Sequence, residues 1–161
     1  MLAAVDFLSL REFERVVPDR DMVFISIGYP DDPAPASLVR FNAGIRLEFL
    51  DNEPGDIAAQ GVEHLLLTGH QAKQVVAFIR GLHAEADSHR LVVHCTVGAS
   101  RSAGVALAAH VMTGCGFPRR PEANYANPHV VSLLARECGL RIDIPEVPGR
   151  DYGYQPPSLL I

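Results

Sequence analysis

The chain has 161 residues, of which 48% are hydrophobic and 20% are charged, so one globular domain with a well-covered core is expected. A formal net charge of -5 argues against a general affinity for nucleic acid or for anionic membranes. The three cysteines, Cys95, Cys115 and Cys138, show no disulfide or metal-ligand spacing. The N-terminal segment carries no basic leader, and no apolar run approaches the roughly 20 residues of a membrane span. We therefore expect a cytoplasmic protein, with its oligomeric state left open.

The first third of the chain carries signals for one helix and two strands. Ser9 and Glu12 stand at capping-box spacing and predict a short helix. Apolar, β-branched runs predict strands over residues 22–27 and 43–50, with a turn-rich loop between them. Residues 51 to about 67 carry few clear signals.

A strong helix signal follows, and then the most apolar strand of the chain. Thr68 and Gln71 form a second capping-box pair at the start of an amphipathic helix. Residues 90–95, RLVVHC, are too apolar for an exposed strand and predict a central strand with both faces covered.

Two more helices complete the predicted elements. One is expected from Ser100 or Arg101 to about residue 113, and another from Pro128 to a stop at Gly139, with Asn127 as its cap. Strands that alternate with helices predict an α/β fold with a single layered domain, in which helices flank a central, mostly parallel sheet. We assign this domain to residues 1–142. The proline-rich residues 143–161 are expected to be an extended tail, packed on the domain or acting as an arm.

The segment HCTVGASRS places a cysteine at the end of the central strand and an arginine at the start of the next helix. The five residues between Cys95 and Arg101 are small or uncharged: Thr96, Val97, Gly98, Ala99 and Ser100. A loop of this length can turn its backbone N–H groups toward one point, beside the positive end of the helix. Arg101 can add two donors to a phosphate bound there. In such a field the pKa of an accessible thiol falls, so Cys95 is expected to be a nucleophile and to oxidise readily.

The same segment matches the pattern H-C-x-x-G-x-x-R-S of the cysteine-dependent protein tyrosine phosphatases. Over about residues 20–138 the chain resembles the small, dual-specificity-like bacterial members of that superfamily. The resemblance implies phosphomonoester hydrolysis through a phosphocysteine on Cys95, with Arg101 and the backbone N–H groups of residues 96–101 binding the phosphoryl group. It also implies that the Ser102 hydroxyl assists the departing thiolate and that His94 holds the loop through backbone hydrogen bonds. No metal or organic cofactor is implied.

The reaction also needs a proton donor for the leaving oxygen. In the large tyrosine phosphatases this aspartate follows a tryptophan, and the present chain has no tryptophan, which excludes that subfamily. In the small members the aspartate follows the strand that precedes the long helix, and Asp51 occupies that position. Asp56 is the main alternative, while Glu53, Asp31 and Asp32 are less favoured.

The expected substrate is a phosphorylated protein, and the preference between phosphotyrosine and phosphoserine or phosphothreonine stays open. The alternatives are a small monophosphate or a lipid phosphate. Polyanionic substrates are disfavoured because the five loop residues carry no charge. Arg119 and Arg120 either favour acidic substrates or are simply solvated. A phospho-binding pseudophosphatase would lack Cys95 or Arg101, and both are present. A rhodanese-like sulfur transferase usually has a shorter loop between its cysteine and arginine, so the spacing disfavours that function.

Overall fold

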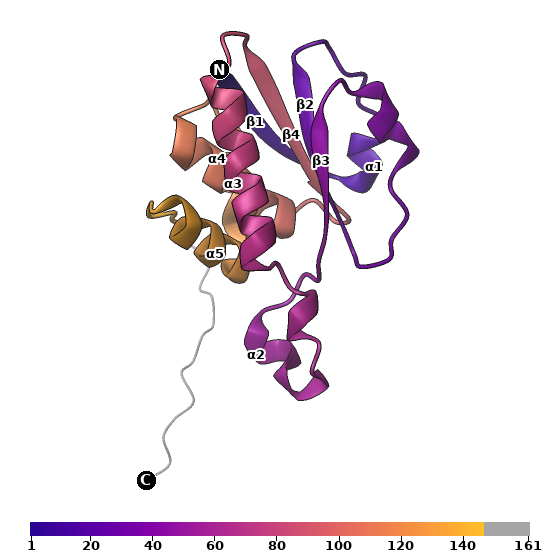
Figure 1. Ribbon diagram of the computed structural model, residues 1–161, viewed down its shortest axis with the longest axis vertical. Coiled ribbons are helices and arrows are strands. Elements are labelled where there is room, and N and C mark those ends of the chain that lie inside the picture. The colour runs from indigo at the N-terminus through magenta and orange to yellow at the C-terminus, as the bar shows by residue number, and fades with distance from the viewer. Residues whose placement is uncertain (147–161) are drawn as a thin grey trace.

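The computed structural model describes residues 1–146 and contains one sheet of four parallel strands (Figure 1). The sheet has the strand order β1-β4-β2-β3, and its strands are β1 (Leu2–Ser9), β2 (Met22–Gly28), β3 (Gly44–Glu48) and β4 (His89–Cys95). Each pairing is parallel, so the carboxyl ends of all four strands meet at one edge. The predicted α/β fold with a central sheet is confirmed.

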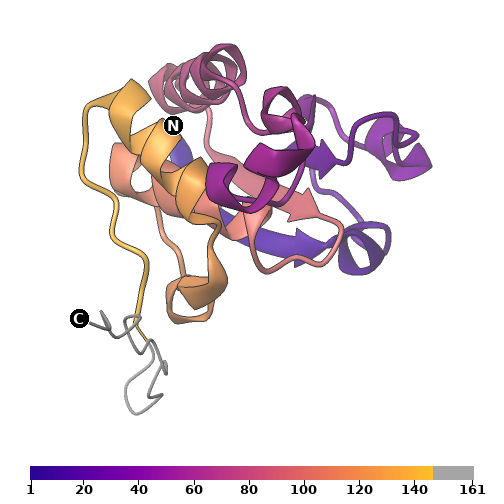
Figure 2. The same ribbon diagram turned by 90° about the horizontal axis from the view of Figure 1, so that it is seen from below.

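Three long helices pack on one face of the sheet, and a short helix lies on the other (Figures 1 and 2). The helices are α1 (Leu10–Phe13), α2 (Pro54–Ile57), α3 (Gly69–Ala84), α4 (Arg101–Thr113) and α5 (Pro128–Cys138). Short 3-10 helices occupy Ala36–Arg40, Ala58–Gln60, Glu63–Leu65 and Arg120–Tyr125. None of the helices described for residues 1–146 has the length and apolar character needed to cross a bilayer.

The helix ends lie where the capping signals predicted them. The Ser9 side chain caps α1 in a capping box with Glu12, and Thr68 caps α3 in the same way with Gln71. Gly139 ends α5 with a φ of 73°, a left-handed conformation that glycine adopts without strain. These local hydrogen bonds fix the boundaries of elements that bring functional side chains to the carboxyl edge of the sheet.

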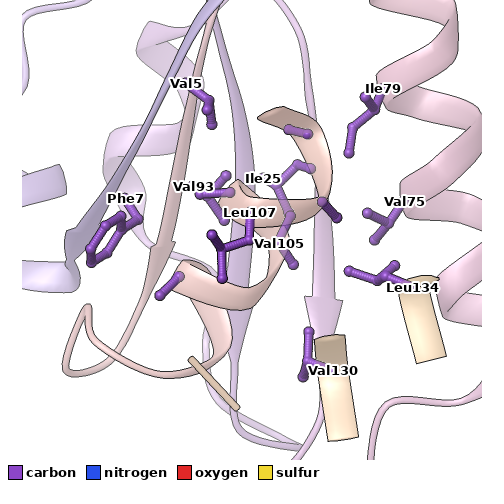
Figure 3. Close-up of a cluster of buried hydrophobic side chains, with 14 of the residues drawn as sticks. Val5, Phe7, Ile25, Val75, Ile79, Val93, Val105, Leu107, Val130 and Leu134 are labelled. Atoms are coloured by element: carbon purple, nitrogen blue, oxygen red, sulfur yellow. The ribbon is translucent and has the colours of Figure 1, made fainter. Parts of the chain in front are cut away.

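The main core lies between the sheet and helices α3, α4 and α5 (Figure 3). It joins strand residues to helix residues, including Val5, Phe7, Ile25 and Val93 from the sheet and Val75, Ile79, Val105, Leu107, Val130 and Leu134 from the helices. Residues 101–109 of α4 are all buried, because this helix lies beneath α3 and α5 against the sheet. The start of α4 is therefore held firmly in place.

A second, smaller core covers the other face of β4. It consists of Phe13, Phe24, Phe41 and Val92, with the rings of Phe13 and Phe41 stacked 5.0 Å apart between centroids. The central strand thus has both faces covered, as its apolar sequence predicted. Aromatic side chains from α1 and from the segment after β2 supply the cover that a long helix supplies on the first face.

Two features of the fold were not predicted. Strand β1 was missed because Asp6 interrupts its apolar run, and the structure places that carboxylate at the strand's own backbone, where it accepts the N–H of Phe7 at 2.8 Å. The stretch after β3 contains α2 and two 3-10 turns. At the other end, residues 143–146 are the start of the tail expected over residues 143–161; they form no helix or strand, and Ile144 packs against the core. Residues 147–161 of that tail lie outside the described residues.

Candidate active site

The loop from Thr96 to Ser100 joins β4 to α4 at the carboxyl edge of the sheet. Because β4 lies between β1 and β2, this loop sits in the middle of that edge, where open α/β sheets bind their ligands. The start of α1 supports it directly, since the Leu10 N–H donates to the Thr96 carbonyl at 3.3 Å. The first N–H groups of α4 have no partner within the helix and carry partial positive charge.

Cys95 ends β4 with its thiol turned into this loop. The Ser102 hydroxyl lies 3.2 Å from Sγ, and the Gly98 N–H donates to the sulfur at 3.2 Å. Burial raises the pKa of the Cys95 thiol, but the hydrogen bonds from Ser102 and Gly98 and the charge of Arg101 outweigh it, so the pKa lies below its ordinary value. Cys95 therefore carries a larger thiolate fraction at neutral pH than a free cysteine.

The Cys95 side chain is buried, whereas the sequence predicted an accessible thiol. Its exposed fraction is 0%, as are those of Arg101 and Ser102. The loop closes around the sulfur because Gly98 and Ser102 approach it from both ends of the turn. Ready oxidation of Cys95 stays a prediction, and it requires the loop to admit the oxidant, since susceptibility depends on exposure as well as on thiolate character.

The Arg101 guanidinium is anchored to the ends of two neighbouring strands. Nη1 donates to the carbonyl oxygens of Gly28 at 3.1 Å and Phe49 at 2.7 Å, and Nη2 donates to Thr96 Oγ1 at 3.2 Å. The Tyr29 ring lies against its face, 4.2 Å from Cζ to the ring centroid. Nε is buried and has no hydrogen-bond partner among the described residues. The Asp51 carboxylate lies 3.8 Å from Nε, beyond hydrogen-bond distance, so Nε can still donate to a further acceptor.

Asp51 lies against the loop, three residues beyond the end of β3. Its Oδ1 accepts hydrogen bonds from Ser100 Oγ at 2.6 Å and from Asn127 Nδ2 at 3.0 Å. Its Oδ2 lies 3.8 Å from Arg101 Nε. One carboxylate therefore contacts the loop, the start of α4 and the start of α5.

The other acidic candidates, Asp31, Asp32, Glu53 and Asp56, are all exposed. Asp56 is exposed and accepts the Glu53 N–H at 3.3 Å, which caps the short helix α2. Asp32 accepts the Tyr29 N–H at 3.0 Å and closes the turn after β2, while Asp31 is exposed with a φ of 68°. Of the proposed acids, the structure brings Asp51 to the loop.

His94 packs rather than binds, which corrects the expectation that it holds the loop through hydrogen bonds. Its ring stacks on Phe13, with 4.1 Å between centroids. Both ring nitrogens are buried without a hydrogen-bond partner among the described residues. Burial lowers the pKa of His94 to about 4, so the imidazole is neutral at physiological pH.

The remaining predicted residues form the loop itself. Val97 is 69% exposed, so its side chain turns outward to solvent. Gly98 has a φ of 76°, which makes the tight turn beneath the sulfur possible. Ala99 is half-buried, and Ser100 precedes α4 with its hydroxyl committed to Asp51.

Two contact residues of the site were not predicted as such. Tyr29, 37% exposed, follows β2 and covers Arg101, and Asn127 was predicted only as a helix cap. The signal for Tyr29 was its place just after a strand that neighbours β4. Arg119 was considered as a contact for acidic substrates. Its guanidinium instead pairs with Glu122 at 2.7 Å and donates to the Phe7 carbonyl at 2.8 Å.

Replacing Gly98 with alanine should destabilise the protein strongly. The new Cβ would lie 2.1 Å from the backbone nitrogen of Ser9, so the loop or β1 must move. Gly139→Ala is the matched control, because Gly139 has a similar φ of 73° but no atom within 4 Å of the added Cβ. The control should cost about 1–2 kcal/mol for the left-handed backbone alone. Denaturant titration should show a clearly larger loss for Gly98→Ala, and equal losses would contradict the close packing of loop and strand.

Within residues 1–146, no group of three or more His, Cys, Asp or Glu side chains is arranged to hold a metal ion. A scan against protein-family models and searches of curated proteins and of solved structures returned no match to this chain. The chemistry of the site must therefore be inferred from its own residues and their geometry.

Proposed function

We propose that this chain is a phosphomonoester hydrolase that forms a phosphocysteine on Cys95, of the protein tyrosine phosphatase or dual-specificity type. One observation carries the proposal. A thiol with a lowered pKa and a buried arginine with an unpartnered Nε occupy the two ends of one short loop. The loop places a nucleophile and a fixed cation around one point, and a phosphoryl group has both the electrophilic phosphorus and the anionic oxygens to match.

In the first step the loop between Cys95 and Arg101 moves to admit the phosphoryl group, because Cys95 is fully buried, and the Cys95 thiolate attacks phosphorus. The S–P bond forms as the P–O bond to the leaving group breaks, and the leaving oxygen takes a proton from Asp51. The loop N–H groups and Arg101 hold the negative charge of the equatorial oxygens, which is greatest in the transition state. The neutral His94 beneath the loop adds no charge to this step.

In the second step Asp51, now ionised, takes a proton from water. The water oxygen bonds to phosphorus as the S–P bond breaks, which releases phosphate and returns the thiolate. The Ser102 hydroxyl, 3.2 Å from Sγ, donates to the sulfur as negative charge returns to it.

The substrate class follows from the surroundings of the loop. The five residues between Cys95 and Arg101 bring no charge for additional phosphates, so a singly phosphorylated group fits best. Tyr29 adds a partly exposed aromatic surface beside Arg101, which favours an aryl phosphate such as phosphotyrosine. A free catalytic thiol functions in a reducing compartment, and we propose the cytoplasm.

Asp51→Asn tests the assignment of the acid. Phenyl phosphate has a poor leaving group. With this substrate the variant's kcat/KM should fall by about 100-fold to 10,000-fold, the usual contribution of a general acid. The falling high-pH limb of its rate profile should disappear, because an amide has no proton to lose in that range. Dinitrophenyl phosphate, whose leaving group departs without a proton, should keep most of its kcat/KM.

Asp56→Asn is the matched control, since the amide oxygen can still accept the Glu53 N–H and preserve the cap of α2. Its profile on both substrates should follow that of the unaltered protein. If Asp56→Asn removes the high-pH limb and Asp51→Asn leaves it intact, the acid has been assigned to the wrong carboxylate.

A further inference from the structure

We infer that Asn127 is a positioning residue for Asp51: it holds Oδ1, so that Oδ2 is the oxygen that carries the transferred proton. This inference rests on the proposed function and assigns a task to a residue outside the matched motif. Asn127 is 4% exposed and stands at the start of α5, more than 70 residues from Asp51 in sequence. Its side chain contacts Asp51 and the first turn of α5 together.

The orientation of the Asn127 amide is fixed by its partners. The Val130 N–H, a donor only, lies 3.0 Å from Oδ1, so that atom must be the acceptor oxygen. The opposite end is therefore the NH2 group, and it donates to Asp51 Oδ1 at 3.0 Å. The Asn127 backbone N–H also donates to the Ser100 carbonyl at 3.2 Å, which connects Asn127 to the loop from Thr96 to Ser100.

The two oxygens of Asp51 then have different environments. Oδ1 accepts from both Ser100 Oγ and Asn127 Nδ2, which occupies it with donors. Oδ2 has its closest charged neighbour in Arg101 Nε at 3.8 Å and faces the cation of the loop. A proton on Oδ2 is thus directed toward the point where phosphate binds. In the step proposed above, the Oδ2–H bond breaks as the leaving oxygen receives the proton and the electron pair of the P–O bond.

Asn127→Asp separates this task from helix capping. Aspartate is an equally good cap and can accept the Val130 N–H, but it replaces the donor to Asp51 with a second carboxylate. We expect the helix cap to persist, with a lower melting temperature than that of the unaltered protein, because two carboxylates lie close together at a buried position. On phenyl phosphate, kcat/KM should fall by up to about 100-fold, the cost of a small misplacement of a catalytic group. The falling high-pH limb should move to higher pH, because a nearby like charge disfavours ionisation.

Asn127→Ser provides a second, uncharged variant. Serine also caps a helix, but its short side chain loses the donor without adding charge. It should also lower kcat/KM on phenyl phosphate. The falling high-pH limb of the rate profile should shift less than in Asn127→Asp. Both variants should retain most of their kcat/KM on dinitrophenyl phosphate. Ser132→Ala, at an exposed position of α5, should leave both rates and the profile unchanged.

The outcomes separate the inference from the proposed function. If Asp51→Asn discriminates between the two substrates and the two Asn127 variants do not, the positioning role is wrong and the hydrolase proposal stands. If the Asn127 variants lower kcat/KM equally on both substrates and also lose thermal stability, Asn127 is structural only and the inference fails. A chain that hydrolyses neither substrate before any substitution overturns both.

Discussion

Cys95→Ser is expected to reduce hydrolysis of an aryl phosphate to background, a loss on the order of 10^6 if the assay can follow it. The serine hydroxyl stays protonated at neutral pH, whereas the hydrogen bonds from Gly98 and Ser102 hold the pKa of the native thiol below its ordinary value. The loop N–H groups and Arg101 are unchanged, so inorganic phosphate should still bind, as measured by titration calorimetry. Turnover and anion binding should therefore separate in this variant.

Cys138→Ser is the matched control for the thiol. Cys138 is half-buried at the end of α5, where Sγ donates to the Ala135 carbonyl at 3.6 Å, and a hydroxyl can replace that contact. This variant should retain its full rate. Substantial turnover by Cys95→Ser would contradict the covalent mechanism, and so would an equal loss in both variants.

Arg101→Lys is the second substitution with a large expected effect. It should lower kcat/KM by about 1,000-fold or more, the range observed when a donor to transition-state charge is removed. A lysine ammonium has no planar fork, so it cannot hold strand carbonyls and phosphate oxygens at the same time. Binding of inorganic phosphate should weaken together with the rate, in contrast to Cys95→Ser.

The same change should also cost stability. Nη1 of Arg101 satisfies the carbonyls of Gly28 and Phe49, and a buried acceptor left without a donor costs about 1–3 kcal/mol. Arg119→Lys is a suitable comparison, because Arg119 also donates to a strand carbonyl, that of Phe7, at 2.8 Å. It should lower stability without lowering turnover. An Arg101→Lys variant that is folded and within tenfold (about 1.4 kcal/mol) of the native rate would refute the role of Arg101.

Features that depend on neighbouring residues in sequence were predicted well. The strand, the loop of five residues and the helix from Cys95 to Arg101 form one continuous unit, and the capping signals at Ser9, Thr68 and Asn127 are local hydrogen bonds. The candidacy of Asp51 came from the family resemblance, and its place beside the loop is explained by the parallel sheet, since the carboxyl ends of parallel strands share one edge.

Features that depend on the order of strands were not predicted. Arg101 is anchored by the backbone carbonyls of Gly28 and Phe49. Every residue has such a carbonyl, so the sequence does not indicate which ones bind the guanidinium. Asn127 reaches Asp51 only because α5 returns to the carboxyl edge. The burial of Cys95 and the packing of His94 on Phe13 arise from the closure of the loop and from a core on the far face of the sheet.

The most direct test of the central claim is to trap the covalent intermediate. The protein would be mixed with a radiolabelled aryl phosphate, quenched in acid during turnover and digested for peptide mapping. We expect the label on the peptide that contains Cys95, in an acid-stable bond that Cys95→Ser cannot form. Release of phosphate with no label on the protein, or with the label on another residue, would contradict a phosphocysteine at Cys95.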